Sequence, residues 1–136
     1  MADLRRISDR YTKLALEVLE ENKELNYIKE MEITIVYLAS DQEKKSKGKV
    51  VLGQCEKVAD KYKWGIPCDF TITLFDPNLT YLTEEQIKRV IFHELLHVGV
   101  SSRGLYVKPH DLEDFKLIID KFGTDWAQPQ IPFTEN

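Results

Sequence analysis

The segment His93-Glu94-Leu95-Leu96-His97 constrains this chain more than any other feature. The chain has three histidines, and two of them stand four positions apart here. On an α-helix, residues four apart share one face, so both imidazoles can bind one ion from the same side. An H-E-x-x-H pattern on a helix is typical of a zinc site in which the glutamate acts as general base. The segment therefore predicts His93 and His97 as metal ligands and Glu94 as the catalytic residue.

The flanking residues favour the helix that this geometry requires. Thr83-Glu84-Glu85-Gln86 is typical of a capping box, in which the threonine and the glutamine cap the first turn reciprocally. Gly99 is a suitable end for the helix. Between these points the apolar residues recur at helical spacing: Ile87, Val90, Ile91, Leu95 and Val98. The pattern predicts a helix of about sixteen residues that carries the whole motif.

Length and composition indicate one folded domain. The chain has 136 residues, of which 43% are hydrophobic and 31% charged, a balance typical of globular proteins. We expect residues 1–136 to form a single domain with one core. Pro129 and Pro132 interrupt the last segment, so residues 127–136 are expected to form an irregular tail.

Charge and hydropathy exclude some classes of partner. The formal net charge of -4 argues against nucleic acid as the main partner. A basic run, Lys44, Lys45, Lys47 and Lys49, is interpreted as a solvated turn. The opening residues have no apolar signal region, and no stretch approaches about eighteen uncharged apolar residues. We therefore expect a cytoplasmic protein without a membrane partner.

The two cysteines are interpreted as free thiols. Cys55 and Cys68 have no cysteine or histidine neighbour at zinc-finger spacing. An intracellular setting disfavours a disulfide, and no dedicated base accompanies a catalytic thiol. Trp64 and Trp126 are interpreted as packing residues.

Periodicity predicts the remaining elements. Residues 3–29 read as one long helix, broken near Asn22, which covers one face of a sheet. Residues 33–38 read as a strand that is buried on both faces, and 41–49 as a polar turn. The segment 49–58 continues either as a strand or as a short helix. A half-exposed strand is predicted at 70–74, an irregular segment at 101–109, and a second helix from about His110 to Phe122, ended by Gly123.

A catalytic zinc usually has three protein ligands and an open fourth position. His110 is the remaining histidine, thirteen residues after His97 and beyond a segment long enough to turn back. We rank His110 first as third ligand, and Glu113 or Asp114 second. Asp111 and Asp114 also suit a helix start, or support of a ligand imidazole.

The spacing after the motif narrows the subclass. A metzincin needs glycine and histidine where this chain has Val100 and Arg103, so that subclass is excluded. A thermolysin-like site would need Glu113 on an unusually short connection. With zinc bound, Glu94 would take a proton from the attacking water and deliver it to the leaving amine. If strand 70–74 forms the sheet edge beside the cleft, it could hold an extended peptide. Arg103 and Tyr106 are interpreted as surface residues rather than oxyanion donors.

The chain also resembles a known family. The residues that carry the resemblance lie between about 30 and 126: Asp69-Phe70-Thr71-Ile72, the H-E-L-L-H motif, His110-Asp111-Leu112-Glu113-Asp114-Phe115, and Phe122-Gly123 with Trp126. Together they resemble the phage metallopeptidase family and, more distantly, SprT-like and Spartan-type metalloproteases. The resemblance implies a zinc-dependent enzyme of phages and prophages, with His110 as third ligand and Asp111 or Asp114 in support. We expect no separate zinc ribbon or DNA-binding extension in residues 1–136.

These observations combine into one hypothesis. We expect an α+β, minimal zincin-like domain with a small twisted mixed sheet of three or four strands. An N-terminal helix, the active-site helix and a C-terminal helix with the third ligand would pack with it. The expected function is zinc-dependent hydrolysis of peptide bonds in a peptide or protein substrate. The alternative is a zinc-stabilised, non-catalytic binding or regulatory module of phage or prophage origin, which the presence of Glu94 disfavours.

Overall fold

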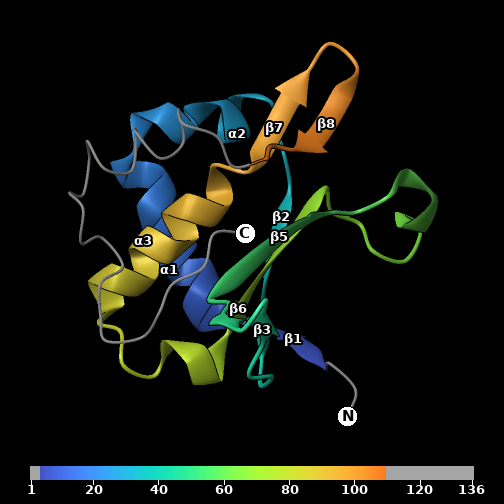
Figure 1. The fold of residues 1–136 in the computed structure, drawn as a ribbon. Helices are drawn as coiled ribbons and strands as arrows, with labels where there is room; N and C mark the ends of the chain where they lie inside the picture. Colours follow the sequence, from blue (N-terminus) through green and yellow to red (C-terminus); the bar gives the residue numbers. More distant parts are fainter. Residues whose placement is uncertain (1–3, 110–136) are drawn as a thin grey trace.

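The computed structural model describes residues 4–109, which form an α+β fold with a four-stranded mixed sheet (Figure 1). The strand order is β1-β2-β6-β5, where β1 is Arg5–Ile7, β2 is Ile35–Ser40, β6 is Phe70–Phe75 and β5 is Gly53–Lys57. The strands β2 and β6 are parallel, while β1 and β5 run antiparallel to their neighbours. The predicted second helix from 110 to 122 and the tail 127–136 lie outside the described residues.

The three α-helices found in residues 4–109 lie on one side of the sheet (Figure 1). They are α1 (Asp9–Glu21), α2 (Asn26–Glu30) and α3 (Glu84–Leu95). Apolar side chains of α1 and α3 form one buried core with the sheet residues Phe70, Ile72 and Leu74. None of the helices in residues 4–109 has the length and apolar character needed to cross a bilayer.

The N-terminal helix is shorter than predicted. Ser8 caps α1 by accepting a hydrogen bond from the backbone N–H of Tyr11. Residues 5–7, which we predicted as helix, instead form β1 and pair with β2. The break near Asn22 is confirmed: this residue is extended, and its side chain donates to the carbonyl of Val18. A 3₁₀ turn, Lys23–Leu25, then leads into α2.

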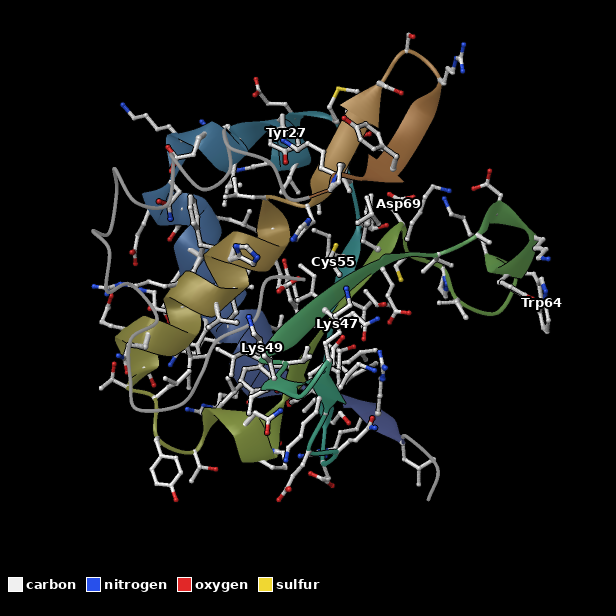
Figure 2. All side chains as sticks on the ribbon, in the orientation of Figure 1. Tyr27, Lys47, Lys49, Cys55, Trp64 and Asp69 are labelled. Carbon is white, nitrogen blue, oxygen red and sulfur yellow. The ribbon has the colours of Figure 1, made fainter. Side chains whose placement is uncertain are left out.

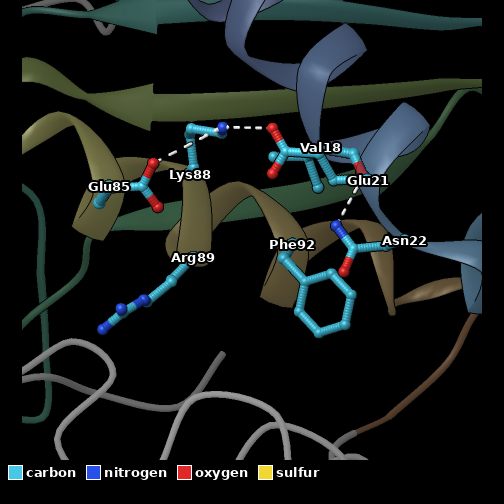
Figure 3. A pocket seen from close by; sticks show the side chains of 7 residues that line it. All are labelled: Val18, Glu21, Asn22, Glu85, Lys88, Arg89 and Phe92. Atoms are coloured by element: carbon cyan, nitrogen blue, oxygen red, sulfur yellow. Dashed lines mark hydrogen bonds and ion pairs between the residues drawn. The ribbon is translucent and has the colours of Figure 1, made fainter.

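A buried lysine links α1 to α3. Lys88 Nζ lies 2.7 Å from Glu21 on α1 and 3.8 Å from Glu85 on its own helix (Figure 3). It also lies 3.5 Å from Glu17 on α1. Glu21 and its neighbours raise the pKa of Lys88, so the amine stays charged where α1 crosses α3. Lys88 also lines a pocket between these helices, together with Val18, Asn22 and Phe92. The ion pairs of Lys88 with Glu17 and Glu21 therefore help to fix the position of α3 relative to α1.

The strand β6 is predicted correctly in position but not in environment. Its residues are buried except for the half-buried Thr71, whereas we predicted a half-exposed strand. Thr73 is fully buried, and Arg5 Nη1 donates a hydrogen bond of 2.9 Å to its hydroxyl oxygen, which lowers the cost of burying this polar group. The strand lies between β2 and β5, so 70–74 does not meet the condition of being a sheet edge that could hold an extended peptide. Among the described residues, β1 and β5 are the edge strands.

Two short hairpins complete the described structure. The polar turn at 41–49 contains β3 (Lys45–Ser46) and β4 (Lys49–Val50). Lys47 and Gly48 have φ of 52° and 78°, as a tight hairpin turn requires, and its lysines 45, 47 and 49 are exposed. The second hairpin pairs β7 (Val98–Ser101) with β8 (Gly104–Val107). The prediction of an irregular segment at 101–109 is therefore wrong.

Residues 58–69 connect β5 to β6 and form an arm that projects away from the sheet (Figures 1 and 2). Its base is anchored by Asp69, which accepts hydrogen bonds from Thr34 and from Lys63 at 2.8 to 3.1 Å. Trp64 near its tip is 90% exposed, so the interpretation of this residue as a packing residue is wrong. The strand β2 also differs from the prediction, because Val36 and Leu38 are only half-buried.

Candidate metal centre

The helix α3 begins as its sequence predicts. Gln86 N–H donates to Thr83 Oγ1 at 3.2 Å, and Thr83 N–H donates to Gln86 Oε1 at 2.9 Å. This capping box satisfies the backbone donors of the first turn, and the next apolar residues, Ile87, Val90 and Ile91, are buried in the core. The start of α3 is therefore fixed relative to the sheet.

The end of α3 differs from the prediction. The helix stops at Leu95 and contains 12 residues, because Val98 and Gly99 pair with β8 as part of β7. His93 and Glu94 lie in the last turn, and Leu96 still has helical backbone angles. His97 follows directly, with its N–H donating to the carbonyl of Glu94 at 3.0 Å. The motif thus spans the helix end instead of lying wholly within the helix.

The structure brings the motif side chains together. The imidazole centroids of His93 and His97 lie 5.1 Å apart, with their planes at 86°. Both histidines and Glu94 are buried, with exposed fractions of 2% or 3%. Two rings at this separation can approach one ion with a nitrogen each.

The orientation of His97 is set by the segment after β8. The carbonyl of Lys108 lies against His97 Nδ1, and the N–H of Lys108 donates to the His97 carbonyl at 2.6 Å. A carbonyl oxygen can only accept, so this contact assigns the proton of the neutral ring to Nδ1. In that tautomer Nε2 carries the lone pair through which an imidazole binds a metal. A backbone carbonyl behind a histidine is a frequent means of orienting a metal ligand.

Glu94 is a buried acid in an apolar setting. Burial raises its pKa to about 8. Its Oε1 has no hydrogen-bond partner among the described residues, and its other oxygen faces β5, where a Cβ placed on Gly53 would lie 3.3 Å from Oε2. A nearby cation would stabilise such a carboxylate. The buried, unpartnered oxygen therefore fits a neighbouring metal ion.

The ligand set is incomplete within the described residues. No group of three histidine, cysteine, aspartate or glutamate side chains that could hold a metal occurs in residues 4–109. The predicted third ligand His110 lies outside this part of the chain, as do Glu113 and Asp114, the alternative ligands, and Asp111. The two histidines described here suit zinc by their chemistry, because imidazole is one of its preferred ligands.

The other candidates from the sequence lie in the β7–β8 hairpin or are not activated. Arg103 is exposed in the turn of the β7–β8 hairpin, and Tyr106 lies against Gly99, which it faces across the hairpin. Cys55 and Cys68 are free thiols, as predicted. Burial raises the pKa of both thiols, which disfavours a nucleophilic role.

Sequence reasoning did not identify Gly53 and Lys108. Lys108 contributes backbone atoms alone to the contact with His97, so its residue type gives no signal. Gly53 follows the apolar run Val50-Val51-Leu52, and a glycine in a strand often marks a close approach of another group. That signal was present in the sequence.

Comparison with protein families gives a match that agrees with the metallopeptidase character of the H-E-x-x-H motif. Residues 6–130 match the sequence model of the family described as "Putative phage metallopeptidase". The match covers most of the chain, which therefore belongs to the phage metallopeptidase family. No match was found among curated proteins or among solved structures.

Proposed function

We propose that the protein is a zinc-dependent metallopeptidase of the zincin type that hydrolyses peptide bonds. The observation that carries this proposal is the arrangement of His93, Glu94 and His97 at the buried end of α3. The two imidazoles lie edge to face at 5.1 Å, and the acid between them has a raised pKa. Membership of the phage metallopeptidase family supports the same activity.

His93 and His97 would hold the metal, and His97 would do so through Nε2 because its Nδ1 faces Lys108. We propose His110 as the third ligand. It follows Lys108 by two residues, so chain connectivity keeps the two Cα atoms within about 7 Å of each other. The backbone of Lys108 is hydrogen-bonded to His97, so His110 is restricted to the neighbourhood of the two motif histidines. Glu113 and Asp114 lie farther along the chain and are less restricted, which favours His110 as the third ligand.

Glu94 would act as the general base and then as the general acid. When bound, zinc lowers the pKa of a coordinated water toward about 7 and polarises the substrate carbonyl. The positive charge beside Glu94 would favour its ionised form and so oppose the effect of burial. Glu94 would then accept a proton from the attacking water and donate it to the leaving amine.

The substrate is proposed to be an extended segment of a peptide or protein. The strand β5 is an edge of the described sheet and contacts α3 beside Glu94. An edge strand can bind an extended chain by strand addition. We therefore propose β5 as the strand that binds the extended peptide, in place of strand 70–74, which lies inside the sheet.

Replacing Glu94 by glutamine tests the proposal. Glutamine has nearly the same shape but cannot accept the proton, so zinc content should equal that of the wild type. Cleavage of a proteome-derived peptide mixture should fall by about 10²–10⁴-fold. Glu84→Gln, at an exposed position of the same helix, is the matched control and should keep activity.

The alternative function predicts a different result. A zinc-stabilised, non-catalytic module would bind zinc, yet its wild type would cleave no more than the Glu94→Gln variant. Persistent cleavage by Glu94→Gln, in turn, would show that another group is the base.

A further inference from the structure

The strand β5 approaches the Glu94 carboxyl group at a glycine. A Cβ placed on Gly53 would lie 3.1 Å from Cγ, 3.4 Å from Cδ and 3.3 Å from Oε2 of Glu94. The separations from Cγ and Oε2 are shorter than ordinary van der Waals contact, and the separation from Cδ is at its lower limit. Any side chain at position 53 would therefore compete with the Glu94 side chain for the same space.

Backbone conformation does not explain the glycine. Gly53 does not adopt a positive φ, and it pairs with Leu74 in the regular register of the sheet. An alanine at this position would meet no backbone strain. The space taken by Glu94 is thus the feature that favours glycine here.

The strand cannot easily move away from α3. The buried Asn78 donates hydrogen bonds from Nδ2 to the carbonyl of Val51 at 2.7 Å and to that of Lys44 at 2.9 Å. The next residue, Leu52, accepts from Phe75 N–H at 3.1 Å. These bonds hold the two residues before Gly53, so an added methyl group would displace the side chain of Glu94 instead of the strand.

Glu94 has little freedom to adapt. It is 2% exposed and lies in the last turn of α3 between two histidines. A catalytic group works within about 0.5 Å of its productive position. We propose that Gly53 is a positioning residue for Glu94, because its missing side chain provides the space that seats the general base. The catalytic consequence rests on the proposed peptidase function, whereas the steric relationship does not.

A double-mutant cycle on thermal stability tests the steric relationship between Gly53 and Glu94 without any assay of activity. Gly53→Ala should lower Tm by about 4 °C in the wild type. It should lower Tm similarly in a Glu94→Gln background, where the side chain keeps its shape. In a Glu94→Ala background the competing atoms are gone, so the loss should disappear. Gly65→Ala is the matched control, because Gly65 is exposed and a Cβ there meets nothing within 4 Å.

Enzyme kinetics then test the effect on the base. With zinc content unchanged, Gly53→Ala should lower kcat by about ten-fold with little change in KM, since a displacement of about 1 Å can cost 10²-fold. A residue needed only for packing would lower Tm and leave kcat per zinc-loaded molecule unchanged.

Four results would overturn the proposal. The first is a Tm loss that persists in the Glu94→Ala background, and the second is a Tm and kcat for Gly53→Ala that equal those of Gly65→Ala. The third is a kcat loss without thermal coupling to position 94. The fourth, in an active enzyme, is a Tm loss with kcat per zinc-loaded molecule unchanged. If the wild type proved to have no peptidase activity, the thermal cycle would still decide whether Gly53 seats Glu94.

Discussion

Lys108 contacts His97 through both of its backbone polar groups. Its N–H donates to the His97 carbonyl at 2.6 Å, and its carbonyl accepts from the His97 imidazole. Because Lys108 follows β8 directly, the β7–β8 hairpin positions the backbone that contacts a proposed metal ligand. We therefore expect the conformation of the hairpin turn to affect metal binding.

The turn of this hairpin offers a test of that coupling. Gly104 has φ of +119° with open space around it, so Gly104→Ala introduces backbone strain of about 1–3 kcal/mol without a clash. We expect the pairing of β7 with β8 to weaken and zinc affinity to fall by about ten-fold or more, although no ligand is changed. Competition with a chromophoric chelator measures the affinity.

Arg103→Ala is the control for this variant. Arg103 is exposed in the same turn, and its replacement should leave zinc affinity unaltered. An unchanged affinity in Gly104→Ala would show that the hairpin does not orient His97.

His110→Ala tests the third ligand, which lies outside the described residues. Loss of one of three ligands should reduce the zinc content of the purified protein and weaken residual binding. Elemental analysis of the purified variants gives the stoichiometry. Glu113→Gln and Asp114→Asn should retain zinc. The reverse pattern, with zinc kept in His110→Ala and lost in one carboxylate variant, would assign the third ligand to that carboxylate.

The local part of the site could be predicted from the sequence. The capping box at Thr83 and the spacing of His93, Glu94 and His97 depend on residues within a few positions of one another. Helix geometry therefore fixes their relationship without knowledge of the rest of the fold. The break near Asn22 is local in the same sense.

The non-local part could not be predicted in this way. The alternation of threonine with apolar residues in β6 resembles a half-exposed strand, but Arg5, 68 residues earlier, satisfies the buried hydroxyl of Thr73. The order of strands decides that β5 is an edge and that β6 is not, and no residue of either strand encodes that order. The contact of Lys108 with His97 likewise depends on a hairpin closing.

Replacement of Trp64 tests the finding that this side chain, on the arm of residues 58–69, is exposed and not a packing residue. It is 90% exposed, so Trp64→Ala should change the free energy of unfolding by no more than about 0.5 kcal/mol. Phe92 is fully buried in the core, and Phe92→Ala should cost about 3–5 kcal/mol. Urea denaturation measures both. A cost above about 2 kcal/mol for Trp64→Ala would mean that this side chain packs against the protein after all.

The two thiols provide a test with pH as the variable. Burial raises the pKa of Cys55, and the carboxylates of Glu94 and Glu56 raise it further. For Cys68, burial again raises the pKa, with a contribution from Asp69. The thiolate is the reactive form, and a raised pKa means that it is scarce at neutral pH. Both native thiols should therefore react slowly with iodoacetamide at pH 8.

The dependence of the iodoacetamide reaction rate on pH distinguishes a buried thiol with a raised pKa from an ordinary cysteine. In urea the rate should level off above about pH 8.5, the usual pKa of a cysteine. In the native protein the pKa lies higher, so the rate should still increase by about ten-fold per pH unit through that point. Mass spectrometry of the peptides assigns the rates to Cys55 and Cys68. A native rate at Cys55 that levels off below pH 8 would indicate an activated thiol beside Glu94 and would restore the nucleophilic interpretation that burial argues against.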